Sequence, residues 1–246
     1  MTRLALVGAM HEEVAALLPC LEDVRVERRA GRDFHLGRLD GHDVIVVRSG
    51  IGKVAAATTA AVLLDAFDAR AVLFTGVAGG LYDAVRVGDV VVGHALLQHD
   101  MDASPLFPRH EVPLTGRSRF DADPAWSARM AQAAREVFSL PCAARAGFGL
   151  AAPALHEGLV VSGDRFVATS TEGARLKADL PDALAVEMEG AALAQVCHDF
   201  GRPFAVVRTI SDRADDLAHV DFPRFIADVA APYSRDIVRA TLRLAR

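Results

Sequence analysis

Carboxylates follow three apolar stretches of the chain, and each stretch is typical of a buried strand. In chain order these acids are Glu12, Glu13, Glu187, Glu189 and Asp212. A sheltered carboxyl can act as a general acid, and a carboxylate can activate water as a base. An ionised carboxylate also accepts two hydrogen bonds at once, as sugar hydroxyls require. The spacing therefore suggests acid–base chemistry on a hydroxylated substrate.

Each of these acids also has a purely structural interpretation. Glu12 and Glu13, and likewise Glu187 and Glu189, could be first-turn acids stabilised by the helix macrodipole. Asp212 could cap the segment that follows its strand. The residue types alone leave both interpretations open.

A glycine-rich run, Gly76-Val77-Ala78-Gly79-Gly80, follows another apolar stretch. Such a run allows backbone amides to approach a ligand closely, or simply makes a tight turn. It lacks the spacing of a dinucleotide-binding fingerprint, and the chain has no Gly-Lys-Ser/Thr phosphate loop. NAD and ATP sites are therefore disfavoured, and no cofactor is expected.

Two further features carry weaker signals. His94, His99, Asp100 and Asp102 form a group of possible metal ligands, but their spacing is loose and no bound metal is expected. Phe166 could be a core residue or a platform that stacks on a flat ring, and the sequence alone favours the core.

The elements that must position these residues alternate along the chain. Strands are expected at Leu4–Val7, Phe34–Leu39, Val44–Arg48, Ala71–Thr75, Val87–Leu97, Leu159–Ser162, Ala183–Val186 and Phe204–Ile210. Helices are expected from Met10 towards Leu18, and at Lys53–Phe67, Pro124–Leu140, Ser170–Leu180, Gly190–Phe200 and Asp221–Arg246, the last restarted at Pro232. Residues 99–119 are expected to form a long loop.

The strands are solidly apolar, which is typical of strands buried on both faces. The sequence thus predicts an α/β fold, with helices on both faces of one mixed sheet, and one domain over residues 1–246. Ligands of open α/β sheets bind at the carboxyl ends of the strands. The four polar or glycine-rich motifs are therefore expected to converge on one crevice.

Composition bounds the class of protein. The chain has 246 residues, 52% of them hydrophobic, and its 27 basic and 32 acidic residues give a net charge of −5 with histidine neutral. A disordered chain would be poorer in apolar residues. The mild negative charge argues against a general binder of nucleic acid or of anionic membranes.

The cysteines and the amino terminus favour a reducing compartment. Cys20, Cys142 and Cys197 are odd in number and far apart, so neither a disulfide framework nor a zinc site is expected. The apolar run at the amino terminus ends within a few residues and is too short for a signal peptide or a membrane span. A soluble cytoplasmic protein is expected.

The ordered set of motifs resembles the nucleoside phosphorylase–nucleosidase superfamily, and within it the 5'-methylthioadenosine/S-adenosylhomocysteine nucleosidases. The resemblance covers nearly the whole chain and is carried by Gly8–Glu13, Ser49–Val54, Thr75–Leu81, Val161–Asp164, Ala185–Glu189 and Ile210–Asp212. It implies a three-layer α/β/α fold, a homodimer, and hydrolysis of the N-glycosidic bond to release adenine and a 5-thioribose.

The resemblance also assigns roles to individual residues. Asp212 would protonate N7 of adenine, Glu13 would orient and activate the attacking water, and Glu189 would bind the ribose hydroxyls. The other residues implied to bind or support the substrate are Met10, Ile51, Val77, Ala78, Gly79, Phe166, Val167, Glu187, Met188, Arg208, Ser211 and Phe222. Among these, Phe166 would stack on adenine, and Arg208 and Ser211 would support the carboxylates.

Three alternatives to this activity remain at the level of the sequence. A phosphate-dependent purine nucleoside phosphorylase is disfavoured because the Gly8–Glu13 segment is acidic and would repel phosphate. A nucleoside-binding protein without catalysis is disfavoured by the presence of Glu13, Glu189 and Asp212 together. The third alternative is a 6-amino-6-deoxyfutalosine nucleosidase. Val77 stands where many members of the family have serine, and some members with valine there also cleave 6-amino-6-deoxyfutalosine.

Overall fold

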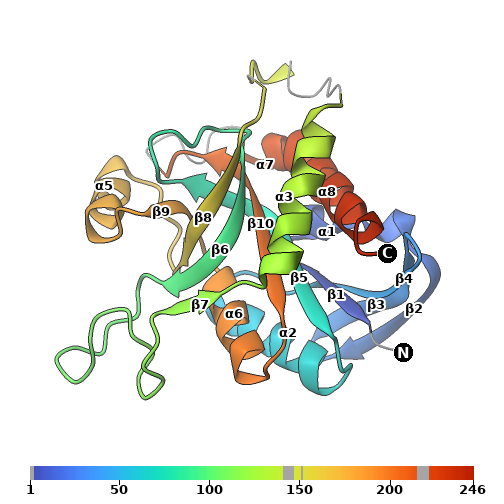
Figure 1. Cartoon of the computed structure of the whole chain (residues 1–246), viewed down its shortest axis with the longest axis horizontal. Coiled ribbons are helices and arrows are strands. Elements are labelled where there is room, and N and C mark those ends of the chain that lie inside the picture. Colours follow the sequence, from blue (N-terminus) through green and yellow to red (C-terminus); the bar gives the residue numbers. More distant parts are fainter. Residues whose placement is uncertain (1–2, 141–146, 151, 215–221) are drawn as a thin grey trace.

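The computed structural model describes residues 3–140, 147–150, 152–214 and 222–246 (Figure 1). Its strands are β1 (Leu4–Gly8), β2 (Glu22–Arg29), β3 (Arg32–Leu39), β4 (His42–Arg48), β5 (Ala71–Gly80), β6 (Val90–Gln98), β7 (Arg119–Asp121), β8 (Leu155–Ser162), β9 (Ala183–Glu187) and β10 (Phe204–Asp212). Its longer helices are α2 (Lys53–Asp65), α3 (Pro124–Phe138), α5 (Ser170–Asp179), α6 (Gly190–Asp199) and α8 (Ala231–Arg243). The shorter ones are α1 (His11–Ala15) and α7 (Phe222–Phe225), with a 3-10 turn at Leu18–Cys20 and a π-helical stretch at Ile226–Ala230.

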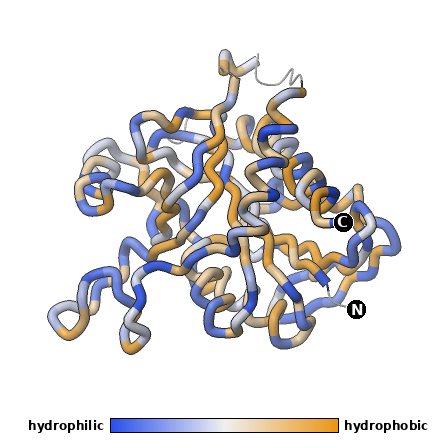
Figure 2. Tube along the Cα trace, in the orientation of Figure 1, coloured by the Kyte–Doolittle hydropathy of each residue, from blue (hydrophilic) through white to orange (hydrophobic). Residues whose placement is uncertain are grey.

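The strands form one mixed sheet in the order β10-β6-β8-β9-β5-β1-β4-β3-β2, and β7 pairs with β6. Because β10 also pairs with β5, the sheet closes on itself through β5, β10, β6, β8 and β9. This closure was not predicted from the sequence, since strand order between distant segments leaves no local signal. Figure 2 shows hydrophobic colouring along the central strands of this sheet.

Helices cover both faces of the sheet, as the sequence predicted. Alternate residues of β1 point to opposite faces. Ala5 and Val7 belong to the core cluster that includes α2 and α6, whereas Leu4 and Leu6 belong to the cluster that includes α1, α3 and α8. A third cluster seats α5 against β8 and β9. The three-layer α/β/α fold and the mixed sheet are therefore confirmed.

The carboxyl ends of several strands meet at one place. β1, β5 and β10 run parallel to one another, so Gly8, Gly80 and Asp212 lie towards the same edge. β9 runs antiparallel to the end of β5, and Val186 pairs with Gly79. The end of β9 therefore lies beside the end of β5, which brings the Glu187–Glu189 segment next to the glycine run.

Several expected boundaries were wrong. β5 does not end at Thr75 but continues through the glycine run to Gly80, because β9 and β10 supply pairing partners along it. β2 was missed because its sequence is highly charged, as suits an exposed edge strand. β8 begins at Leu155, and the short β7 lies at the end of the predicted loop. The expected carboxy-terminal helix begins at Asp221, which lies outside the described residues.

Candidate active site

A pocket of about 650 Å³, partly open to solvent, lies where these strand ends meet. Its concave wall combines apolar side chains with a few convergent polar groups, as small-molecule sites do. Fourteen of the predicted site residues line it: Met10, Glu13, Ile51, Val77, Ala78, Gly79, Phe166, Val167, Glu187, Met188, Glu189, Ser211, Asp212 and Phe222. Arg208 lies behind the lining, and Ala9, Arg165 and Val186 line the pocket without having been predicted.

Glu13 is buried at the base of the pocket on α1, whereas its neighbour Glu12 is exposed. Its Oε2 accepts hydrogen bonds from the amides of Ala9 at 2.5 Å and Met10 at 2.9 Å, and its Oε1 accepts one from Val77 at 3.1 Å. Burial raises the pKa of Glu13, while the charge of Arg208 and these amides oppose that rise. A raised pKa makes the ionised carboxylate a stronger base.

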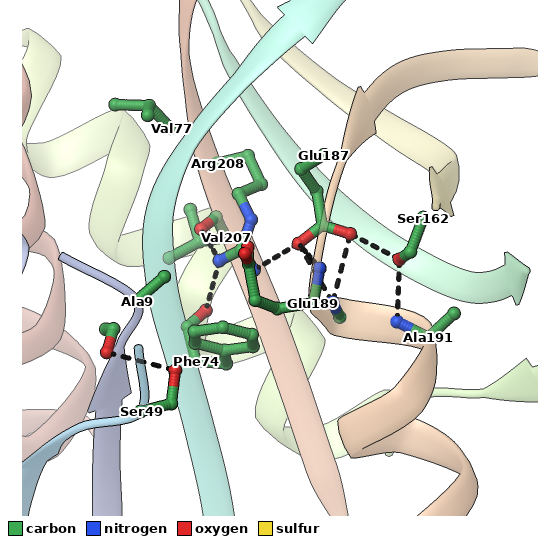
Figure 3. Close-up of polar contacts among 12 residues, drawn as sticks. Ala9, Ser49, Phe74, Val77, Ser162, Glu187, Glu189, Ala191, Val207 and Arg208 are labelled. Carbon is green, nitrogen blue, oxygen red and sulfur yellow. Dashed lines mark hydrogen bonds and ion pairs between the residues drawn. The ribbon is translucent and has the colours of Figure 1, made fainter. Parts of the chain in front are cut away.

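Arg208 and Glu187 form a buried ion pair at 2.8 Å, with both side chains almost fully inaccessible to solvent (Figure 3). The guanidinium lies 4.0 Å from the ring centroid of Phe74, which gives it a cation–π contact. Arg208 also donates to the carbonyl oxygens of Val207 and Phe74 at 3.2 and 3.4 Å. The arginine is thus a buried positive charge behind several acids.

The Glu187 carboxylate is engaged on both oxygens. It accepts hydrogen bonds from the Ser162 hydroxyl and from the amides of Glu189 at 3.2 Å and Gly190 at 2.9 and 3.0 Å (Figure 3). Ser162 in turn accepts a hydrogen bond from the amide of Ala191 at 2.7 Å. Glu187 therefore acts as the helix-terminal acid of the structural interpretation, and its predicted contact with a substrate stays a prediction.

Glu189 is also buried, and its Oε1 accepts a hydrogen bond from the amide of Gly52 at 2.8 Å. Burial, together with the negative charge of Glu187, raises the pKa of Glu189 to about 8, although Gly52 and Arg208 oppose the rise. The carboxyl is therefore largely protonated at neutral pH in the free protein. A protonated carboxyl can both donate to and accept from hydroxyl groups.

Asp212 ends β10 and is buried at the pocket wall. The Ser211 hydroxyl donates to its Oδ2 at 2.8 Å, and the amide of Ala214 donates to its Oδ1 at 2.8 Å. These donors stabilise the carboxylate form that remains after a proton has been given away. The role of Asp212 as a general acid stays a prediction.

Apolar side chains form the rest of the pocket. The Phe166 ring is 46% exposed, which excludes the core position that the sequence alone favoured for it. It meets the ring of Phe222 edge-on, with 6.2 Å between the centroids. An exposed aromatic face beside a pocket can stack on a flat heterocycle.

The possible metal ligands of the sequence, His94, His99, Asp100 and Asp102, do not form a metal-binding cluster within the described residues. His94 pairs with Glu157 at 3.0 Å, Asp100 pairs with Lys53 at 2.7 Å, and the carboxylate of Asp102 accepts from the Ser104 amide. Within the described ranges, no cluster of three or more histidine, cysteine or acidic side chains has metal-binding geometry. Cys20 and Cys197 are free thiols, and Cys142 lies outside the described residues.

Residues that hold the carboxylates were partly missed. Ser162 and Gly52 occur in the motifs of the resemblance, but their hydrogen bonds to Glu187 and Glu189 join distant segments and have no local signal. Arg165 was missed because a single arginine in a loop is commonplace. It pairs with Glu172 at the exposed rim.

Comparison with known proteins agrees with this geometry. The family model described as the phosphorylase superfamily matches residues 3–243. The 5'-methylthioadenosine/S-adenosylhomocysteine nucleosidase of Geobacillus thermodenitrificans is 37% identical over 97% of this chain and 95% of its own.

Solved structures give the same result. The corresponding nucleosidase from Neisseria meningitidis, in complex with methylthio-immucillin-A, has a TM-score of 0.88 at 35% identity over 99% of this chain and all of its own. The futalosine hydrolase of Helicobacter pylori has a TM-score of 0.85 at 32% identity over 98% of this chain and 97% of its own. The chain belongs to the phosphorylase superfamily, and within it to the family of 5'-methylthioadenosine/S-adenosylhomocysteine nucleosidases.

Proposed function

We propose that this protein hydrolyses the N-glycosidic bond of 5'-methylthioadenosine and S-adenosylhomocysteine, releasing adenine and a 5-thioribose. The observation that carries the proposal is the convergence of Glu13, Glu189 and Asp212 on one pocket. Cleavage of a glycosidic bond passes through an oxocarbenium-like state, so it needs an acid at the leaving group and a poised nucleophile. The three carboxyls supply these functions and a sugar ligand.

Asp212 acts on the leaving group. It gives a proton to N7 of adenine, which draws electrons from the bond between C1' of the ribose and N9 of the base. The remaining Asp212 carboxylate is stabilised by Ser211 and by the Ala214 amide. Phe166 stacks on the adenine, and the Val167 backbone reads the edge of the base.

Glu13 acts on water. Its buried carboxylate accepts a proton from a water molecule as the oxygen attacks C1', and the negative charges around the sugar stabilise the positive charge that develops there. Its three backbone hydrogen bonds fix the carboxylate in place. Glu189 binds the ribose hydroxyls, and Met10 and Met188 line the ribose. Glu187 and Arg208 position this group through their ion pair.

The charges of the pocket favour hydrolysis over phosphorolysis. Four acids line it, namely Glu13, Glu187, Glu189 and Asp212, against one basic residue, Arg165, among the described residues. Arg165 is itself paired with Glu172 at the surface. Glu187 is neutralised by Arg208 and Glu189 is largely protonated, so the unpaired charge of the pocket is that of the Glu13 carboxylate. A phosphate ion would be repelled by this carboxylate, and the described lining offers it no basic residue that is not already paired.

The direct test is the release of free adenine from 5'-methylthioadenosine, with and without phosphate in the buffer. Equal release under both conditions is expected for a hydrolase. Release only in the presence of phosphate would make the protein a phosphorylase and remove the role of Glu13 in activating water. Binding of the nucleoside without release of adenine would contradict an enzymatic function.

One observation favours 6-amino-6-deoxyfutalosine as a second substrate. Val77 lines the pocket and offers the sugar no side-chain hydroxyl. The similarity to a futalosine hydrolase is consistent with a broader choice of 5' group. Comparing kcat/KM for the three nucleosides before and after Val77→Ser would show whether this position sets the choice.

We further propose that the chain is one domain, acts as a homodimer and is located in the cytoplasm. One continuous sheet joins β1 to β10, which supports a single domain over residues 1–246. Leu106 and Leu114, in the long loop, expose 83% and 90% of their surface, and the homodimer would cover them. The free thiols of Cys20 and Cys197 support a reducing compartment. No described helix has the length and apolar character needed to cross a bilayer.

A further inference from the structure

The amino terminus of α2 is held by carboxylates from two other segments. The Gly52 amide donates to Glu189, which follows β9, and the Lys53 amide donates to Oδ1 of Asp164 at 2.7 Å. Asp164 follows β8. Two amides that a helix leaves without internal partners are therefore satisfied by acids that lie more than a hundred residues away in the sequence.

A third acid, Asp100, ties this arrangement together. Its Oδ1 accepts a hydrogen bond from Nζ of Lys53 at 2.7 Å, and its Oδ2 accepts one from the amide of Asp164 at 2.9 Å. Lys53, Asp100 and Asp164 thus form a closed ring of contacts, which we call the α2 clamp. The Lys53 side chain is only 17% exposed, so its ion pair is partly shielded from solvent.

The packing behind the clamp limits its movement. The His99 ring lies directly against Gly163, and any side chain at position 163 would overlap that ring. Gly52 also approaches Asp164 closely, since a Cβ there would lie 3.0 Å from Oδ1. The segments at residues 52–53, 99–100 and 163–164 therefore fit together in one arrangement.

From these contacts we infer that Lys53, Asp100 and Asp164 are positioning residues for ribose recognition, acting through the Gly52 amide on Glu189. The inference rests on the proposed role of Glu189 in binding the ribose hydroxyls. The clamp fixes the start of α2, the start of α2 fixes the Gly52 amide, and that amide fixes the Glu189 carboxyl. None of the three residues lines the pocket.

The test compares 5'-methylthioadenosine with its 2'-deoxy and 3'-deoxy analogues in wild type, Lys53→Met and Asp100→Asn. The ratio of kcat/KM for the ribo and deoxy substrates measures how well the hydroxyls are bound. We expect this ratio to fall about tenfold in both variants, the effect of losing one hydrogen bond to a charged or buried group. Most of the change should appear in KM for the ribo substrate.

The matched control is Lys177→Met, which removes the chain's other lysine. Lys177 lies on α5, outside the pocket lining, and its Nζ pairs with Oδ1 of Asp83 at 2.8 Å. This variant should keep the wild-type ratio. If Lys53→Met and Asp100→Asn slow the ribo and deoxy substrates equally, the clamp supports only the fold and the inference is wrong.

Amide hydrogen exchange separates this inference from the proposed function. The Gly52 and Lys53 amides should exchange faster in Lys53→Met and Asp100→Asn than in wild type or Lys177→Met. If wild type releases no adenine, the proposed function fails and exchange alone decides whether the clamp exists. Unchanged exchange at Gly52 in both clamp variants would overturn the inference, whatever the activity.

Discussion

At the level of single residues, the site contains buried acids that differ in their partners. Among the described residues, Glu13 accepts hydrogen bonds from backbone amides, Glu187 accepts one from an arginine, and Asp212 accepts them from a hydroxyl and an amide. Amide donors and Arg208 favour ionised carboxylates, whereas burial favours protonated ones. The carboxyls are therefore not equivalent, as the proposed roles of Asp212 as acid and Glu13 as base require.

Replacing Asp212 by asparagine tests the acid directly. Asp212→Asn keeps the size of the side chain and removes the proton donor, so adenine release should fall by about 10² to 10⁴-fold. The far-UV circular dichroism and the melting temperature should stay close to wild type. Near-normal turnover in this variant would show that leaving-group protonation does not depend on Asp212.

The raised pKa of Glu189 makes a prediction for stability. Because the folded protein holds this proton up to about pH 8 and the unfolded chain releases it near 4.5, the folded state binds more protons between these values. The free energy of unfolding of the ligand-free protein should therefore decrease as pH rises from 4.5 to about 8. Glu189→Gln should flatten that dependence in urea titrations at several pH values. An equal slope in both proteins would assign the effect to another group.

At the level of elements, β5 is the central support of the site. Its Gly76 lies so close to Glu13 that a Cβ would stand 2.7 Å from Oε1, and its Gly79 would place a Cβ 2.8 Å from Oδ1 of Asp212. Both carboxyls with a proposed catalytic role are therefore packed on bare backbone of one strand. The glycines are needed for this close approach.

Gly76→Ala should displace the Glu13 carboxylate and lower kcat by about 10²-fold, since a small misplacement of a reacting group costs this much. The control is Gly80→Ala, whose added methyl would meet Ile210 and Val85 at 3.2 and 3.3 Å and no carboxylate. That variant should lose stability with a smaller effect on kcat. Similar kcat values for the two variants would argue against the role of Gly76.

The sequence predicted these elements unevenly. The apolar strands and α3 were predicted well, because local hydrophobicity determines the strands and local residues such as the N-cap Asp123 fix the start of the helix. The extension of β5 and the edge strand β2 were not, since distant strands supply the pairing. For the site, the family resemblance selected the lining residues. The side-chain partners of Glu187 and the Gly52 partner of Glu189 come from segments distant in the sequence, which no local pattern reveals.

At the level of the whole molecule, the long loop between β6 and β7 carries exposed apolar residues away from the sheet (Figure 1). The proposed homodimer would cover them. Leu106→Ser combined with Leu114→Ser should shift sedimentation from dimer towards monomer. Arg109, in the same loop but paired with Asp179, offers Arg109→Gln as a control that should stay dimeric. A wild-type protein that sediments as a monomer at all concentrations would contradict the proposal.

The site divides into a rigid floor and an accessible rim, and this division bears on how the enzyme could be redesigned. The floor consists of acids held by strand ends and glycines, and substitutions there are expected to disturb the proposed chemistry. The rim includes Ile51 and Phe166, which expose 60% and 46% of their surface and so bear little of the packing of the core. A library confined to Ile51, Phe166 and Phe222 could therefore be screened for nucleosides with altered bases or 5' groups while the acids of the floor are kept unchanged.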